Sequence, residues 1–195
     1  MKSRVSVGIV MIASAVLLML AREARADSAN LSVASPGTVS QGSTFTVDVN
    51  ISGVTDLYDY QLDLAFNPSV VSAMAVLEGS FLSSGGPTVF LPGTIDNAAG
   101  TITLNADTLV GAIPGVTGSG TLLEFEFSAL AAGTSELVIA NEILQDSTGA
   151  VLSDTVTNGL VMVPGTGTVP EPSSFVLIAL GVMGLAGVCR KRITP

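Results

Sequence analysis

The chain has 195 residues, one cysteine, no histidine and a net charge of −9 at pH 7. All seven Lys and Arg residues lie before residue 26 or after residue 189, so the long middle section carries acids and no base. Such a section is repelled by nucleic acid, cannot form a disulfide, and lacks the His and Cys side chains that most nucleophilic and general-base catalysis requires.

The first 26 residues have the layout of a secretory signal peptide. Lys2 and Arg4 precede an apolar core at residues 5–20, and Ala24 and Ala26 supply the small side chains that signal peptidase requires. The alternative is a retained membrane anchor, but the core is short and is followed by this cleavage pattern. We therefore predict cleavage after Ala26 and export of the remainder.

Residues 30–163 alternate between apolar and polar side chains, which is typical of half-buried β-strands. The clearest runs are residues 44–51, 58–66 and 123–127. The side chains predicted to face a core are Phe45, Val47, Val49, Ile51, Tyr58, Tyr60, Leu62, Leu64, Phe66, Leu123, Phe125 and Phe127. No long amphipathic helix is indicated.

Glycine-containing turn signals separate these runs and several shorter strand candidates. The predicted turns are residues 97–100, 118–120 and 146–149, and the shorter strand candidates are residues 101–105, 136–140 and 159–163. About nine short strands without helical crossovers favour two packed antiparallel sheets. We therefore predict an all-β sandwich over residues 27–163.

Three sequence blocks of this region carry a family resemblance. Residues 39–49 read VSQGSTFTVDV, residues 56–68 read DLYDYQLDLAFNP, and residues 118–127 read GSGTLLEFEF, with Gly-Thr-Ser further along at residues 133–135. Together they resemble a cohesin-type domain over roughly residues 30–163. The resemblance implies a nine-stranded jelly-roll sandwich related to bacterial carbohydrate-binding modules. Cohesins of cellulosomes bind dockerins, so a dockerin-like protein is one implied partner.

Two glutamates of the strand at residues 123–127 are the best candidates for a catalytic pair. Glu124 and Glu126 project from one face of the strand, about 7 Å apart from the strand rise. Glycosidases use paired carboxylates, but theirs flank a cleft. A solvated outer face is the favoured interpretation, and we predict that the protein is not an enzyme.

Four oxygen-bearing side chains, those of Asp56, Asp59, Asp63 and Asn67, could offer ligands to calcium. Their spacing lacks the Asp-x-Asp-x-Asp-Gly pattern of a calcium loop, which favours a scattered acidic surface. No metal site or cofactor is therefore assigned, and calcium stays an open alternative.

Tyr58 and Tyr60 could stack on sugar rings. Their alternation with Leu62 and Leu64 instead predicts that they point into the core. With no Trp in the chain, a flat aromatic sugar platform is not favoured.

From residue 164 the periodicity ends in Pro-Gly-Thr-Gly-Thr-Val-Pro-Glu-Pro, a linker over residues 164–172. An apolar stretch at residues 175–189 follows and ends in three cations. Residues 173–195 are therefore predicted to form a single transmembrane helix with a cytoplasmic basic stop, at the short limit for spanning a bilayer. The motif residues are Val169, Pro170, Glu171, Pro172, Arg190, Lys191 and Arg192.

The order of Pro-Glu-Pro, apolar helix and basic cluster resembles the PEP-CTERM sorting domain of Gram-negative, exopolysaccharide-making bacteria. The resemblance implies processing by an exosortase-type membrane protease. It also implies a precursor anchored in the inner membrane and a product at the cell surface or in the extracellular matrix.

Together these features predict an exported, non-enzymatic binding module whose ligand is a polysaccharide, a biofilm matrix component or a surface protein. One alternative is a passive structural matrix protein that associates through calcium. Another is a cohesin with a dockerin-like protein partner.

Overall fold

The β-branched and aromatic residues that alternate along the chain form strands throughout the computed structural model, which describes residues 28–165. Ten strands and one helical turn follow in chain order: β1 Ala29–Val33, β2 Gly37–Thr38, β3 Thr44–Ala65, β4 Val71–Glu78, α2 Ser80–Ser83, β5 Thr88–Asp96, β6 Thr101–Leu109, β7 Val116–Ala129, β8 Gly133–Asp146, β9 Asp154–Thr157 and β10 Gly159–Val163. The predicted signal peptide and transmembrane helix lie outside the described residues. Within residues 28–165, no helix is long and apolar enough to cross a membrane.

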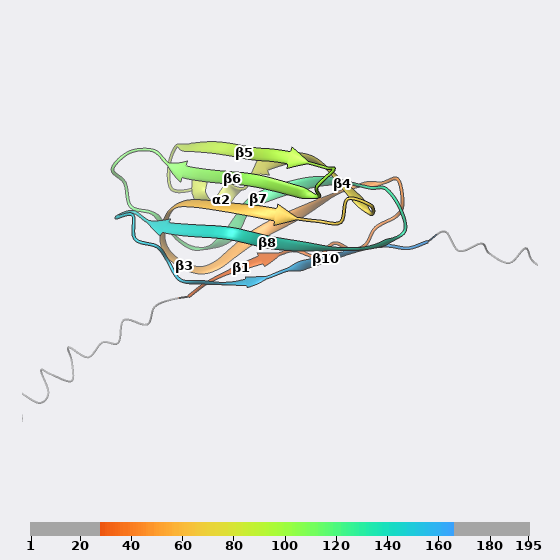
Figure 1. Cartoon of the computed structure of the whole chain (residues 1–195). Helices are drawn as coiled ribbons and strands as arrows, with labels where there is room; N and C mark the ends of the chain where they lie inside the picture. The colour runs from red at the N-terminus through yellow and green to blue at the C-terminus, as the bar shows by residue number, and fades with distance from the viewer. Residues whose placement is uncertain (1–27, 166–195) are drawn as a thin grey trace, which may run out of the picture.

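The strands form two sheets that share β3 (Figure 1). In the first, sheet I, the order is β4-β7-β3-β1-β9, with the first half of β3 at the centre. In the second, sheet II, the order is β5-β6-β3-β8-β10-β2, with the second half of β3 at the centre. All pairs are antiparallel except β1 with β9 and β10 with β2. The predicted all-β sandwich is confirmed.

Strand β3 replaces the two separate strands that we predicted at residues 44–51 and 58–66. It passes from sheet I to sheet II through a kinked segment in which Gly53 and Asp56 have φ of 67° and 62°. These left-handed residues shift the alternation, so Leu57 is buried and Tyr58 is only partly buried. The described residues contain ten strands, including the two-residue β2, against about nine predicted.

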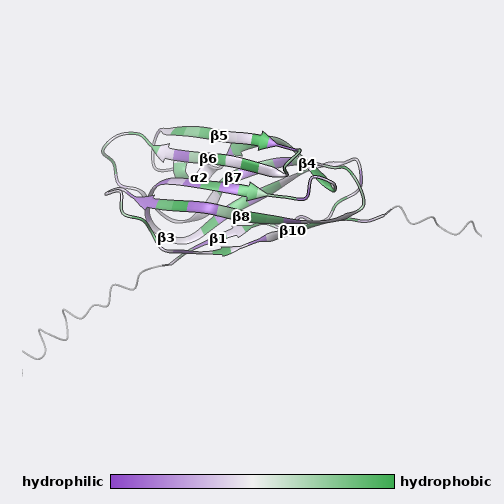
Figure 2. Cartoon of the chain, in the orientation of Figure 1, coloured by the Kyte–Doolittle hydropathy of each residue, from purple (hydrophilic) through white to green (hydrophobic). Residues whose placement is uncertain are grey.

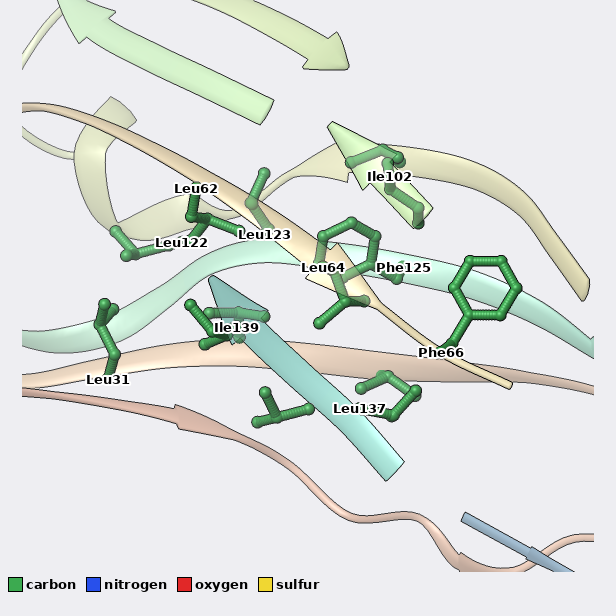
Figure 3. Close-up of a cluster of buried hydrophobic side chains, with 14 of the residues drawn as sticks. Leu31, Leu62, Leu64, Phe66, Ile102, Leu122, Leu123, Phe125, Leu137 and Ile139 are labelled. Carbon is green, nitrogen blue, oxygen red and sulfur yellow. The ribbon is translucent and has the colours of Figure 1, made fainter. Parts of the chain in front are cut away.

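The core lies between the sheets and is built wholly from residues 29–163. Figure 3 shows side chains from β1, β3, β6, β7 and β8 meeting there. Phe127 stacks on Phe45 with ring centroids 5.7 Å apart and meets Phe66 edge-on at 5.3 Å. Of the side chains predicted to face the core, all are buried except Phe45 and Tyr58, which pack against it partly buried. Because each large buried side chain contributes roughly 1.5–3 kcal/mol, this segment has the core of an independently folding unit.

The glycine-containing segments have different roles from one another. The predicted turns at residues 97–100 and 146–149 are confirmed. The predicted turn at residues 118–120 is wrong, because this segment is part of β7 and pairs with β3. Glycine is needed there for space: a Cβ on Gly120 would lie 2.8 Å from the ring of Phe81 in α2.

Candidate functional site

The outer face of sheet II carries a row of four side chains in register across four strands, with an exposed apolar residue at each end and the partly exposed Ala106 and Gln61 between them. Leu91 on β5 pairs with Ala106 on β6, Ala106 pairs with Gln61 on β3, and Gln61 pairs with Ile143 on β8. Leu91 is 57% exposed and Ile143 is 45% exposed. At a strand spacing of about 4.8 Å, this row is about 14 Å long. We call these four residues the apolar row.

A leucine beside this row has an unusual backbone. Leu104 on β6 has φ of 60° and its side chain is 60% exposed. A left-handed conformation costs an ordinary residue roughly 1–2 kcal/mol, and exposure of leucine to water adds no compensation. Strain of this kind persists only where the surroundings impose it, and it is found most often at functional sites.

Asp63 on β3 holds that backbone in place. Its Oδ1 accepts a hydrogen bond from the Leu104 N–H at 2.8 Å, and its Oδ2 accepts one from the Asn141 amide at 2.7 Å. Asn141 on β8 is also left-handed, with φ of 51°. The pairing of β3 with both neighbours shifts register beside Asp63. One carboxylate therefore fixes two strained residues on either side of β3.

Acidic side chains share this face with the apolar row. Asp59 lies on the same side of β3 as Gln61, and burial raises its pKa. Of the 16 acidic residues in the chain, only Glu23, Asp27 and Glu171 lie outside the described segment, which contains no Lys, Arg or His. The face thus combines exposed apolar groups with a negative potential, a combination suited to a basic partner surface.

The outer face of sheet I is polar over its central strands, and its exposed large apolar side chains, Met74 and Leu77, lie on the edge strand β4. Thr121 donates a hydrogen bond to Asn50 at 2.8 Å, and Asn30 donates one to Thr155 at 3.0 Å. These side chains satisfy one another across the strands. In sheet II, Figure 2 shows hydrophobic and hydrophilic residues alternating along β8, because one face of this strand is buried and the other faces outward.

Glu124 and Glu126 project from this polar face, as predicted. Glu124 lies opposite Asp48 on β3, and Glu126 lies opposite Thr46. Their neighbours Phe125 and Phe127 are buried on the other side of β7. Glu126 lines an open hollow with Thr46 and Met74, but Glu124 does not, so the two glutamates do not flank a common cleft.

The four proposed calcium ligands are not brought together. Asp56 accepts hydrogen bonds from the Gly115 N–H at 2.6 Å and the Ser147 hydroxyl at 2.7 Å, and the latter bond holds its pKa below the usual value. Asp63 is occupied with β6 and β8, as described above. Asn67 instead donates to the carbonyl of Thr134 at 3.3 Å. Within residues 28–165, no three acidic side chains are arranged to hold a metal ion.

The two tyrosines serve the fold. Tyr60 is 1% exposed and its hydroxyl donates to the Leu122 carbonyl at 2.8 Å, so its predicted position in the core is confirmed. Tyr58 packs partly buried against the core and donates to the Gly111 carbonyl. In the described segment, every aromatic side chain is buried or half-buried.

Sequence reasoning missed the apolar row, the strain at Leu104 and a buried acid, Asp107. The alternation of β6 concealed the last two: apolar residues at 102, 104 and 106 alternate with polar residues at 103, 105 and 107, which predicts that Asp107 points outward. Asp107 and Asn105 are buried, at 2% and 0% exposure. The predicted sorting residues and cleavage-site residues lie outside the described residues.

Comparison with known proteins was made for the whole chain. A model of the Cohesin domain family matches residues 29–163, and a model of the PEP-CTERM protein-sorting motif matches residues 168–192. The curated proteins give no match. The chain is similar to a non-cellulosomal cohesin from the hyperthermophilic archaeon Archaeoglobus fulgidus, with 18% identity over 72% of this chain and 94% of that one, at a TM-score of 0.57.

Two cohesins from Acetivibrio cellulolyticus give similar values. A type II cohesin domain of its cellulosome is 17% identical over 70% of this chain and 98% of that one, with a TM-score of 0.58. The sixth cohesin of its scaffoldin B, solved in complex with a mutant Cel5 dockerin, is 19% identical over 70% and 99%, with a TM-score of 0.56. At these identities the likeness shows the fold.

Cohesin domains are non-catalytic binding modules, and the PEP-CTERM motif indicates exosortase-dependent export to the cell surface. Because the family model covers most of the chain, this protein belongs to the cohesin family and carries a C-terminal PEP-CTERM sorting motif.

Proposed function

We propose that this cohesin domain binds a protein partner on the outer face of sheet II. The observation that carries the proposal is Leu104, an exposed leucine held in a left-handed conformation by Asp63. Stability alone would favour glycine or a polar residue at such a position. A partner that covers Leu104 and the apolar row would offset both the strain and the exposure.

The partner is basic and dockerin-like. Residues 28–165 carry many carboxylates and no cation, so a basic partner surface is attracted to every side of the domain and an acidic one is repelled. Solved cohesins similar to this domain have been captured with dockerins, including one complex from Clostridium thermocellum. Apolar contacts at the row would then provide most of the affinity, with the acids guiding the approach.

Sorting would place this binding face outside the cell. In this proposal, residues 1–26 direct export, residues 173–195 hold the precursor in the inner membrane, and an exosortase-type protease cuts near Pro170, Glu171 and Pro172. Intact-mass analysis of the protein from its host tests the proposal: wild type should end near Pro172, and Glu171→Ala should retain the tail. A retained tail in both would leave residues 173–195 as a permanent anchor.

A photo-crosslinking amino acid at position 91 of the full-length protein tests the binding face in the living host. Met74 on β4 is the matched control, because it is 56% exposed against 57% for Leu91 and belongs to the other sheet. We expect one protein to be crosslinked from position 91 and not from position 74. Crosslinks from both positions alike, or only to glycans, would contradict the proposal.

The other candidate functions have less support. A polysaccharide site normally offers an exposed aromatic ring, whereas every aromatic ring of the described segment is buried or half-buried. Calcium-mediated matrix association would need carboxylates that converge, whereas those of Asp56 and Asp63 are each occupied by hydrogen bonds within the domain.

A further inference from the structure

Asp107 on β6 is an acid inside the sandwich. It is 2% exposed and lies in register with Phe90 on β5 and Tyr60 on β3. As a carboxylate, neither of its oxygens has a hydrogen-bond partner of ordinary geometry, although the backbone N–H of Thr108 acts to lower its pKa. A buried and unpaired carboxylate costs several kcal/mol, so the ionised form is strongly disfavoured in the fold.

Glu78 at the end of β4 is the acceptor that a protonated Asp107 needs. Its Oε1 accepts a hydrogen bond from the Thr88 hydroxyl at 2.6 Å, which holds Glu78 against the start of β5. A proton on Asp107 then supplies the donor for a hydrogen bond to Glu78. Burial, as the larger cause, and the negative charge of Glu78 together raise the pKa of Asp107 to about 7.

No positive charge opposes this arrangement. The remaining ionisable neighbour is Tyr60, whose pKa is raised by burial and by the two carboxyl groups. Helix α2 contributes Ser, Phe, Leu and Ser, and residues 28–165 contain no Lys, Arg or His. A second negative charge beside Glu78 would therefore go uncompensated.

We propose that Asp107 and Glu78 share one proton, and that loss of this proton loosens the β5–β6 hairpin and weakens partner binding. The hairpin is the element affected because Thr88 begins β5 and Asp107 belongs to β6. The same hairpin carries Leu91 and Ala106 of the apolar row. The binding part of this inference rests on the proposed function, whereas the loosening does not.

The direction of the effect follows from the raised pKa. Because the folded-state pKa of about 7 exceeds the ordinary value of 3.8, the folded state holds the proton more tightly than the unfolded state. The stabilisation is complete below pH 3.8 and is lost as the pH rises through about 7. The hairpin is therefore tight at pH 5.5 and loose at pH 8.5.

Amide hydrogen exchange of the segment from Asp27 to Gly165, corrected for intrinsic rates, tests the loosening without any partner. This segment contains the whole core, so it can be produced without the termini. From pH 5.5 to pH 8.5 we expect protection of the β5 and β6 amides to fall on the order of 10- to 100-fold. Asp107→Asn, which carries a neutral donor for Glu78, should remove this fall.

Glu126→Gln is the matched control, because it removes one charge from the exposed face of sheet I. It should retain the wild-type pH dependence. Carbon-13 NMR titration of the Asp107 carboxyl group in wild type keeps the test valid even if Asp107→Asn does not fold. Titration below pH 5, or pH-independent protection of β5 and β6, would overturn the inference.

The crosslinking experiment separates the two ideas. If crosslinking from position 91 succeeds while protection is independent of pH, the proton inference fails and the binding face stands. If protection falls as expected and no protein is crosslinked, the binding face fails and the shared proton stands. If both hold, crosslinking from position 91 should decline at least threefold at pH 8.5 in wild type and not in Asp107→Asn.

Discussion

The two outer faces of the sandwich are built on one strand, β3, and differ in what they leave unsatisfied. On sheet I, polar side chains such as Asn50 and Thr121 bond one another over the central strands, and the exposed large apolar side chains lie on the edge strand β4. On sheet II, exposed apolar groups stand beside a leucine whose backbone is strained. The central strands of sheet I are therefore satisfied in water, whereas sheet II would gain from a partner. The contrast supports the proposed binding face on sheet II.

Asp63→Ala should break this contrast most severely. It frees the N–H of Leu104 and the amide of Asn141, and hydrogen bonds to a carboxylate contribute about 1.5–3 kcal/mol each before discounting for solvent. Because Asp63 is only partly buried, we expect the free energy of unfolding to fall by about 2 kcal/mol in urea denaturation. Asp63→Asn keeps an acceptor for Leu104 and should show a smaller loss. Equal stability of all three proteins would show that Asp63 does not hold these strands.

Leu91→Asp should affect binding and leave folding nearly unchanged. An acid in the apolar row adds a desolvation cost at the interface, and we expect at least about tenfold weaker affinity for a purified partner, or about 1.4 kcal/mol. Calorimetric titration against the crosslinked partner measures this. Met74→Asp adds the same charge to sheet I and should retain wild-type affinity. A similar loss in both variants would mean that net charge, not the row, controls binding.

Leu104→Gly should separate strain from contact. Glycine accepts φ of 60° freely, so the relief of strain should stabilise the domain by about 0.5–1 kcal/mol, while the lost side chain weakens partner binding. Thermal unfolding and affinity should thus change in opposite directions. A destabilised Leu104→Gly variant would show that this leucine contributes to folding.

The sequence alone was sufficient to predict the sandwich and most of its core, because strand alternation is a local property. Val47, Leu62 and Phe125 illustrate this, since each follows the period of its own strand and each is buried. The glycines at 118 and 120 led to a wrong prediction of a turn. Gly120 is required because the ring of Phe81, in a distant segment, leaves no space for a side chain at this position. Close approach between segments leaves no local pattern.

The candidate site could not be predicted in the same way, because it depends on contacts between distant residues. Asp63 and Leu104 are 41 positions apart, and Asp63 and Asn141 are 78 apart. Their hydrogen bonds coincide with the register shifts beside Asp63. After Leu104, the polar side chains of Asn105 and Asp107 are buried. Without knowledge of the irregularity at Leu104, Asp107 could not be recognised as an acid that points into the core.

Asp48→Asn should give the smallest effect and the sharpest comparison with Asp63. Both aspartates lie on β3 and are partly buried, but Asp48 faces Glu124 across sheet I, where like charges repel. Removing that charge should stabilise the domain by a few tenths of a kcal/mol, up to about 0.5 kcal/mol, and the gain should shrink in 1 M salt. Urea denaturation at two salt concentrations measures it, with Asp63→Asn as the control on the other face. Destabilisation by Asp48→Asn as large as that by Asp63→Asn would show that the outer face of sheet I also depends on its carboxylates. The distinction between a satisfied face and a face that lacks its partner would then fail.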